Sequence, residues 1–164
     1  MARLRRSLSS LPPRALVEPV GADLVALAQA HALDVTVFPH QSLPPVLGAD
    51  APPSVWVARA ERDGPVIGFV ATRANQSALE ISGLAVELLH RRAGLGRALV
   101  RAAVRSARKR GFSTVELHVS TGNAAALALY ASERFRKAQR VEGFYSDERF
   151  PDDGDAWLMI RDVR

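Results

Sequence analysis

ISGLAVELLHRRAGLGR, residues Ile81–Arg97, reads as a β-strand, then a basic glycine loop, then the first turn of a helix. Glycine has no Cβ, so Gly94 and Gly96 let the backbone approach a ligand closely. A helix that begins at this loop directs its unpaired N–H groups and the positive end of its dipole toward the loop. The three arginines of the stretch add forked donors that suit phosphate oxygens. The stretch therefore predicts an anion site, and phosphate is the usual anion at such a site.

Two other interpretations of this loop are open. A dinucleotide-binding fingerprint has the spacing G-x-G-x-x-G. Here Leu99 stands at the third glycine position, and no acidic residue occurs from Arg91 to Arg110, so the sequence disfavours that fingerprint. The other interpretation is a plain strand–turn–helix connection with a solvated basic face. It loses favour once the second half of the chain is read.

Length and composition are those of one ordinary globular domain. The chain has 164 residues, of which 48% are hydrophobic and 24% charged, and it has no cysteine. Disulfides, thiolate metal sites and a cysteine nucleophile are thereby excluded, and the four histidines lack metal-ligand spacing. No apolar run approaches the ~18 residues of a membrane span. We expect a disordered basic leader at 1–13, a single domain at 14–164 and a cytoplasmic protein without a metal or a membrane partner.

The positive charge is concentrated in one segment. The formal net charge is +5, and Arg91 to Arg110 holds eight basic residues and no acidic ones. Arg97, Arg101, Arg105 and Arg108 recur at helical spacing, which predicts a solvated basic face on an amphipathic helix. Such a face could steer a polyanionic cofactor or lie against ribosomal RNA. No RNA-binding module with interleaved aromatic residues is visible, so direct nucleic-acid recognition is not the expected main function.

The order of elements along the chain predicts an α/β fold. The segment 38–53 holds five prolines and cannot be a regular element throughout. The other segments form a meander of strands followed by a helix, a strand, a helix and a final hairpin. We therefore expect a mixed, mostly antiparallel sheet of about seven strands, locally parallel around the helix crossover and flanked by helices. Strands are expected at 14–20, 54–59, 66–72, 78–86, 114–119, 137–144 and 156–161, and helices at 23–32, 94–110 (capped by Gly111) and 123–135.

The motif Arg91-x-x-Gly94-x-Gly96 resembles the (Gln/Arg)-x-x-Gly-x-(Gly/Ala) acyl-CoA signature of the GNAT superfamily of N-acetyltransferases. The string LAVELLHRRAGLGRAL fits the family pattern without a gap, and the order of elements matches over roughly 14–163. The resemblance implies the GNAT fold and acetyl-CoA as the acetyl donor. The residues that it implies for cofactor binding are Leu84, Ala85, Val86, Arg91, Arg92, Ala93, Gly94, Leu95, Gly96, Arg97, Asn123 and Tyr130.

A second motif, LHVSTGNAAALALY, carries two of these residues. Asn123 stands at a helix start, where asparagine is a preferred cap, and the resemblance adds a contact with a pantetheine amide. Tyr130 either packs in the core or, as in many relatives, acts as a general acid toward the leaving thiolate. The chain departs from the family at Arg134, where relatives usually have the glycine of Leu-Gly-Phe. The turn there must differ or must accept a left-handed residue.

The general base has two candidates. An amine attacks only when it is neutral, so a base must remove a proton. Glu80 corresponds by spacing to the base glutamate of many family members, and His118 corresponds to the histidine or glutamate that serves some N-terminal acetyltransferases. Glu80 as a surface strand residue and His118 as a hydrogen-bonded sheet residue are the simpler explanations. The sequence does not order the two candidates.

The acceptor is the least determined part. HRRAGLG, LHV, Phe144-Tyr145 and the ending DGDAWLMIRDV resemble protein N-terminal acetyltransferases and the enzyme that acetylates the N-terminal alanine of a ribosomal protein. This implies a protein or peptide α-amine as acceptor, possible ribosomal protein substrates, and a substrate wall from Phe38, Phe144 and Tyr145. The acidic loop 147–155 either attracts a basic peptide or is a solvated loop. A small-molecule amine acetyltransferase, a non-catalytic acyl-CoA-binding module, and a monomer or homodimer all stay open.

Overall fold

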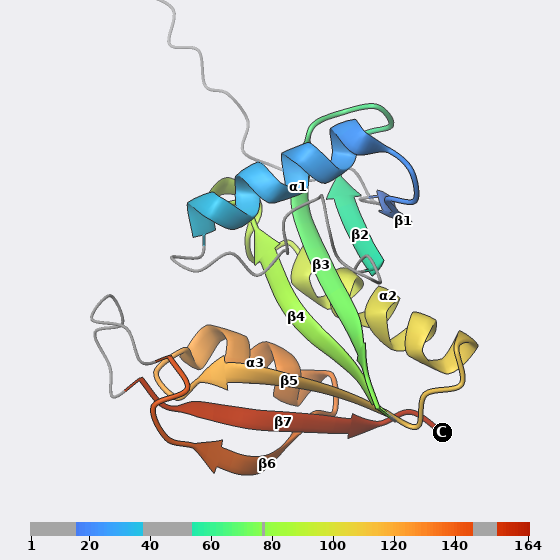
Figure 1. Ribbon diagram of the computed structural model, residues 1–164. Helices are drawn as coiled ribbons and strands as arrows, with labels where there is room; N and C mark the ends of the chain where they lie inside the picture. The colour runs from blue at the N-terminus through green and yellow to red at the C-terminus, as the bar shows by residue number, and fades with distance from the viewer. Residues whose placement is uncertain (1–15, 38–53, 77, 146–153) are drawn as a thin grey trace, which may run out of the picture.

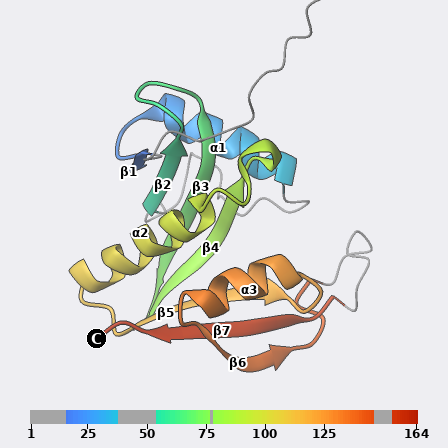
Figure 2. The ribbon, with the colours of Figure 1, turned by 180° about the vertical axis from the view of Figure 1, so that it is seen from behind.

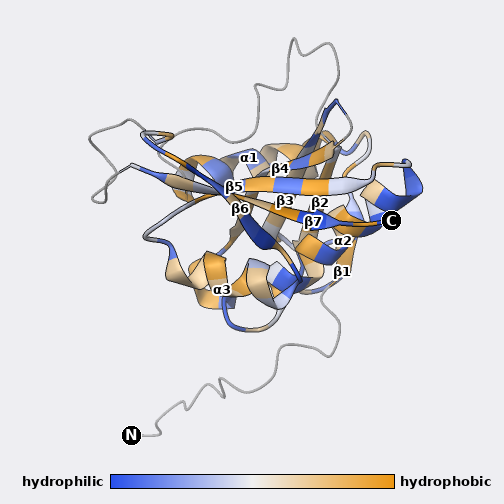
Figure 3. Ribbon diagram, turned by 90° about the horizontal axis from the view of Figure 1, so that it is seen from below, coloured by the Kyte–Doolittle hydropathy of each residue, from blue (hydrophilic) through white to orange (hydrophobic). Residues whose placement is uncertain are grey.

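The computed structural model describes residues 16–37, 54–76, 78–145 and 154–164. In this part of the chain seven strands form one sheet in the order β1-β2-β3-β4-β5-β7-β6, with helices on both faces (Figures 1 and 2). Seen from below, α1 lies on one side of the sheet, and α2 and α3 lie on the other (Figure 3). The strands are β1 (Leu16–Pro19), β2 (Ser54–Arg59), β3 (Val66–Asn75), β4 (Ala78–Val86), β5 (Thr114–Ser120), β6 (Arg136–Val141) and β7 (Ala156–Asp162). The helices are α1 (Leu24–Val37), the short 3-10 helix η1 (Leu88–His90), α2 (Leu95–Lys109) and α3 (Ala124–Ser132).

The sheet is mixed, as the sequence predicts. Every neighbouring pair is antiparallel except β4 and β5, which are parallel because α2 crosses over between them. The parallel pairing covers only Ala78–Ile81 against Thr114–Leu117. Beyond these residues the two strands diverge (Figure 1). The divergence begins next to Ser82, the extra residue of a β-bulge in β4 that faces Ala71 and Thr72 of β3.

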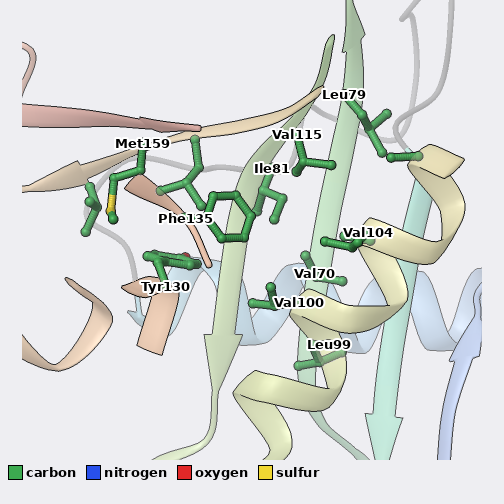
Figure 4. Close-up of a cluster of buried hydrophobic side chains, with 14 of the residues drawn as sticks. Val70, Leu79, Ile81, Leu99, Val100, Val104, Val115, Tyr130, Phe135 and Met159 are labelled. Atoms are coloured by element: carbon green, nitrogen blue, oxygen red, sulfur yellow. The ribbon is translucent and has the colours of Figure 1, made fainter. Parts of the chain in front are cut away.

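Two apolar clusters hold the helices to the sheet. On one face, α2 packs Leu99, Val100 and Val104 against the sheet residues Val70 and Ile81 (Figure 4). The other face carries a smaller cluster beneath α1, built from α1 alanines and strand residues such as Phe69. Burial of a leucine or valine side chain contributes about 1.5–3 kcal/mol, so the apolar stripe of α2 fixes the helix and the loop before it.

The turn after α3 explains the departure at Arg134. Arg134 has φ 65°, so it occupies a left-handed position, which is the conformation that the glycine expected from the resemblance would adopt. The Phe135 N–H reaches back to the Tyr130 carbonyl at 3.0 Å, which is the closing bond of a helix C-terminal turn. The turn is therefore kept and the arginine accepts the left-handed backbone. Gly111, with φ 80°, ends α2 in the same way, as predicted.

Four predicted boundaries are wrong by three residues or more. Strand β3 continues to Asn75 instead of ending at 72, because residues 73–75 still pair with β4. Helix α1 continues to Val37 instead of ending at 32, because Leu33 and Val37 pack on the cluster beneath it. Helix α3 ends at Ser132, because the turn at Arg134 reverses the chain. Strand β6 ends at Val141, so Phe144 lies in a turn rather than in the final hairpin strand.

Some expectations fall outside the described residues: the leader 1–13, the proline-rich segment 38–53 with Phe38, and most of the acidic loop 147–155. None of the helices in the described ranges has the length and apolarity that crossing a bilayer requires.

Candidate active site

The candidate site lies where β4 and β5 separate. Leu84, Ala85 and Val86 pair with β3 on one side, and β5 does not pair with them on the other. His118 is the first β5 residue beyond the parallel pairing. We call this region the β4–β5 opening: residues 82–86 of β4 and 118–120 of β5. Its unpaired strand edges leave backbone groups available for a chain-like ligand such as a pantetheine arm.

The glycine loop adjoins the opening at the end of β4. Gly94 is the N-cap of α2 with φ 84°, and no side chain caps the helix there. The first-turn N–H groups therefore lack a side-chain acceptor. A Cβ built on Gly94 would meet nothing within 4 Å, whereas one on Gly96 would lie 3.1 Å from Leu129 Cδ2 of α3. Arg91 Nε donates to the Val86 carbonyl at 3.0 Å, which ties the loop to the strand end.

These features fit the phosphates of acetyl-CoA. The helix N-terminus presents N–H donors, the space beside Gly94 is open, and Arg91 and Arg92 lie within the loop. Ala93, Leu95 and Arg97 complete the predicted set, although Leu95 itself is buried in the core beneath α2. The cofactor roles of these residues stay predictions.

Substitution of Gly94 tests the loop. We expect Gly94→Ala to weaken acetyl-CoA binding at least tenfold, because the Cβ both strains the left-handed backbone and enters the space in front of the helix. Gly111→Ala is the matched control, since Gly111 has φ 80° at the far end of the same helix and equal open space. Calorimetric titration with acetyl-CoA should show the loss only for Gly94→Ala. Equal affinities for both variants would contradict the loop assignment.

His118 lies in a half-buried, aromatic setting. Its ring stacks on Phe144 with centroids 4.2 Å apart and planes 11° from parallel. Its Nδ1 has no hydrogen-bond partner among the described residues. Burial lowers the pKa of His118 from its usual 6.5, against the opposing charges of Glu80 and Glu116. The imidazole is therefore neutral at pH 7, which is the form that accepts a proton.

Glu80 lies on the same face of the sheet, but its carboxylate is engaged. Arg73 binds both oxygens, Nε to Oε2 at 2.7 Å and Nη2 to Oε1 at 3.0 Å. Glu116, beside Glu80 in the β4–β5 register, accepts from Asn75 Nδ2 at 2.6 Å. Both oxygens of Glu80 are thus occupied by Arg73, whereas the Nδ1 of His118 has no partner among the described residues. The geometry thus favours His118 over Glu80 as the base.

Tyr130 of α3 is buried and has its ring edge-on to Phe135, with centroids 5.7 Å apart (Figure 4). Burial raises the pKa of Tyr130 above its usual 10, and Tyr145 adds to the rise. The phenol therefore keeps its proton throughout the neutral range, although the same rise makes it a weaker acid. Phe144 and Tyr145 also contact each other, and the Tyr145 hydroxyl donates to the His118 carbonyl at 3.4 Å.

Asn123 caps α3, as one of its two interpretations predicts. Its Oδ1 accepts from the Ala126 N–H at 3.1 Å. Its contact with a pantetheine amide stays a prediction.

The basic face of α2 is exposed to solvent, as predicted, and its first two arginines also form ion pairs. Glu133 is only 5% exposed and forms ion pairs with both. Its Oε1 lies 3.2 Å from Arg97 Nε and 3.0 Å from Arg101 Nη2. Arg161 of β7 donates to the Glu133 carbonyl at 2.7 Å. The sequence did not predict this cluster. Its one indication in the sequence is that Glu133 stands next to Arg134, which departs from the family pattern.

The structure thus brings together His118, Phe144 and Tyr145, with Glu80 near enough to affect the charge on His118. Tyr130 lies near enough to Tyr145 for the two side chains to interact electrostatically. Phe38 is not described. Arg73 and Glu116 were not foreseen, because their partners follow from strand register rather than from local pattern.

Curated proteins with similar sequences include N-acetyltransferases. N-acetyltransferase family 8 member 3 of Mus musculus is 41% identical over 97 residues, which are 56% of this chain and 41% of that protein. The ribosomal protein bS18-alanine N-acetyltransferase of Escherichia coli (strain K12) is 34% identical over 84 residues, 51% of this chain and 57% of that protein. The chain therefore spans about half the length of the curated relatives it matches.

Solved structures share the fold. The ribosomal-protein-S18-alanine N-acetyltransferase from Escherichia coli superposes with a TM-score of 0.73 at 23% identity, covering 92% of this chain and 94% of that chain. Arabidopsis thaliana NAA60 in complex with a bisubstrate analogue gives 0.72 at 21% identity, covering 92% and 99%. The family model described as the acetyltransferase (GNAT) family matches residues 24–134, which include the glycine loop and Tyr130. This chain belongs to the acetyltransferase (GNAT) family, as its resemblance and fold class predict.

Proposed function

We propose that this chain transfers the acetyl group of acetyl-CoA to a primary amine, and that the amine is the N-terminal α-amine of a protein or peptide. The observation that carries the proposal is the position of His118, which lies where β4 and β5 separate, is neutral at pH 7 and stacks on Phe144. Family membership supports the donor. The acceptor is supported by the name of one Escherichia coli enzyme, similar in both sequence and structure, which specifies a ribosomal protein's alanine.

Each site residue has a task in this proposal. Acetyl-CoA supplies the acetyl group as a thioester. The glycine loop binds its phosphates, and the free edges of Leu84–Val86 hold its pantetheine arm. His118 accepts a proton from the acceptor amine, and Tyr130 donates a proton to the departing sulfur. The neighbouring carboxylates of Glu80 and Glu116 favour a cationic acceptor such as an ammonium group.

The α-amine suits a base of this kind. Its pKa is about 8, so a useful fraction is neutral at pH 7, whereas a lysine with pKa about 10.4 is almost entirely protonated. Because its pKa is lowered, His118 is unprotonated over the pH range in which an α-amine begins to lose its proton. We further propose a single domain from residue 14 onward, a cytoplasmic location, and a monomer or homodimer.

A panel of acceptors tests the proposal. Thiol release from acetyl-CoA is followed with peptides that have a free N-terminal alanine, the same peptides with a blocked N-terminus and an internal lysine, and small amines. We expect turnover with the free N-termini and none with the blocked peptides. Turnover only with small amines would favour the small-molecule alternative. Cofactor binding without turnover on any acceptor would favour a non-catalytic module.

A further inference from the structure

Asp155 is a buried carboxylate at the start of β7 that the proposed chemistry does not use. It is 7% exposed, and its oxygens are directed at the end of β6 and the turn beyond it. Arg140 Nε donates to Oδ2 at 2.7 Å, and the Gly143 N–H donates to Oδ1 at 2.9 Å. The Asp155 carbonyl accepts from the Thr121 N–H at 3.0 Å, just after β5. One residue thus joins the ends of β5 and β6.

The turn that Asp155 holds carries the aromatic wall. Gly143 has φ 61°, so the strand stops and the chain turns at Phe144. On the far side of Phe144, the Tyr145 N–H donates to the Gly154 carbonyl at 2.8 Å. Gly154 has φ 72°, and a Cβ there would lie 3.0 Å from the Tyr145 carbonyl oxygen. The segment Gly143–Tyr145 is therefore fastened at both ends next to Asp155.

We propose that Asp155 is a positioning residue that holds the Gly143–Tyr145 turn so that Phe144 covers the ring of His118. Phe144 is 42% exposed, so the stack covers His118 with one face while the other face of Phe144 meets solvent. In the described part of the chain, the Phe144 ring contacts two other rings, those of His118 and Tyr145. Its position then depends on the backbone of the turn.

The stack has a measurable consequence for His118. Burial is the largest cause of its lowered pKa, and Phe144 supplies part of that burial. The charged groups that face His118 are Glu80, Glu116 and Arg73, from β4, β5 and β3. Release of the turn leaves the three charged groups in place but moves Phe144 away from the His118 ring. The pKa of His118 then rises toward about 6.5.

Asp155→Ala tests the inference, with Asp162→Ala as the matched control. Asp162 lies at the opposite end of β7 from Asp155 and pairs with a β6 arginine, Arg136, at 3.9 Å, but its side chain is 74% exposed. NMR titration of the His118 ring in the purified protein should show a higher pKa in Asp155→Ala and no change in Asp162→Ala. Phe144→Ala should raise the pKa in the same direction, and the double variant should add little to either single change.

The outcomes separate this inference from the proposed function on which its catalytic meaning rests. If Asp155→Ala does not fold, Asp155→Asn, which keeps one acceptor for Gly143, should give a smaller rise. An unchanged His118 titration in the folded Asp155 variant would overturn the inference, even if His118 proves essential for turnover. A raised pKa together with an acidic limb of kcat/KM moved to higher pH would support both. A raised pKa with an unchanged rate profile would support the positioning role and count against His118 as the base.

Discussion

Tyr130→Phe should lower kcat for acetyl transfer by about 10²-fold while the affinity for acetyl-CoA changes little, because the phenol is expected to protonate the leaving sulfur. Burial keeps the proton on this phenol, since it raises the pKa of Tyr130 above its usual value. Removal of the oxygen leaves the ring in place against Phe135, so packing is retained. Steady-state kinetics and calorimetric titration with acetyl-CoA measure the two quantities separately.

Ser132→Ala is the control for Tyr130→Phe. It removes a hydroxyl from the same helix, where Ser132 Oγ donates to the Leu129 carbonyl at 2.7 Å on the exposed side. We expect its kcat to be that of the wild type. If Tyr130→Phe also turns over at the wild-type rate, Tyr130 is a packing residue and the acid must be sought elsewhere.

His118→Gln should lower kcat/KM by about 10²-fold or more, because it removes the group expected to accept the amine proton. The titration of His118 should also be visible in the dependence of wild-type kcat/KM on pH. Between the pKa of His118, which lies below 6.5, and that of the α-amine near 8, log kcat/KM should rise with slope about 1. Below the histidine pKa, both the base and the amine are protonated, so the slope should approach about 2. The steeper region should be absent in His118→Gln.

Glu80→Gln is the comparison that orders the two candidate bases. Its carboxylate already binds Arg73 through both oxygens, so we expect less than about a tenfold loss. The loss should come from the electrostatics around His118, on which Glu80 acts. A loss in Glu80→Gln larger than that in His118→Gln would reverse the assignment of the base.

The elements around the glycine loop could be predicted from sequence because their signals are local. Gly94 and Gly111 stand where α2 needs left-handed backbone, and the apolar spacing of Leu99 and Val100 marks its buried face. The parallel contact of β4 with β5 follows from the helix between them. Asn123 at the start of α3 follows from the ordinary preference for a cap.

The charged contacts of the site could not be predicted in the same way. Glu133 collects arginines from α2 and from β7, which are distant in the sequence. The Arg73–Glu80 pair depends on the register of the β3–β4 hairpin, which places Arg73 opposite Glu80. These pairings are set by the folded geometry and not by periodicity.

The placement of Phe144 shows the same limit. The sequence predicts a strand from 137 to 144, but the positive φ of Gly143 turns the chain two residues after the strand ends. The aromatic ring then lies over His118 rather than in the final hairpin. The substrate wall of Phe144 and Tyr145 stays a prediction, and the sequence did not foresee the stack of Phe144 on His118.

The most direct test of the account is a structure of this chain with acetyl-CoA bound. We expect the pyrophosphate at the N-terminus of α2 beside Gly94 and Gly96, and the pantetheine arm between β4 and β5. The sulfur should lie within hydrogen-bond reach of the Tyr130 hydroxyl, with His118 facing the acetyl group. The account would be contradicted if the cofactor lay outside the β4–β5 opening, or if Glu80, released from Arg73, faced the thioester while His118 pointed away.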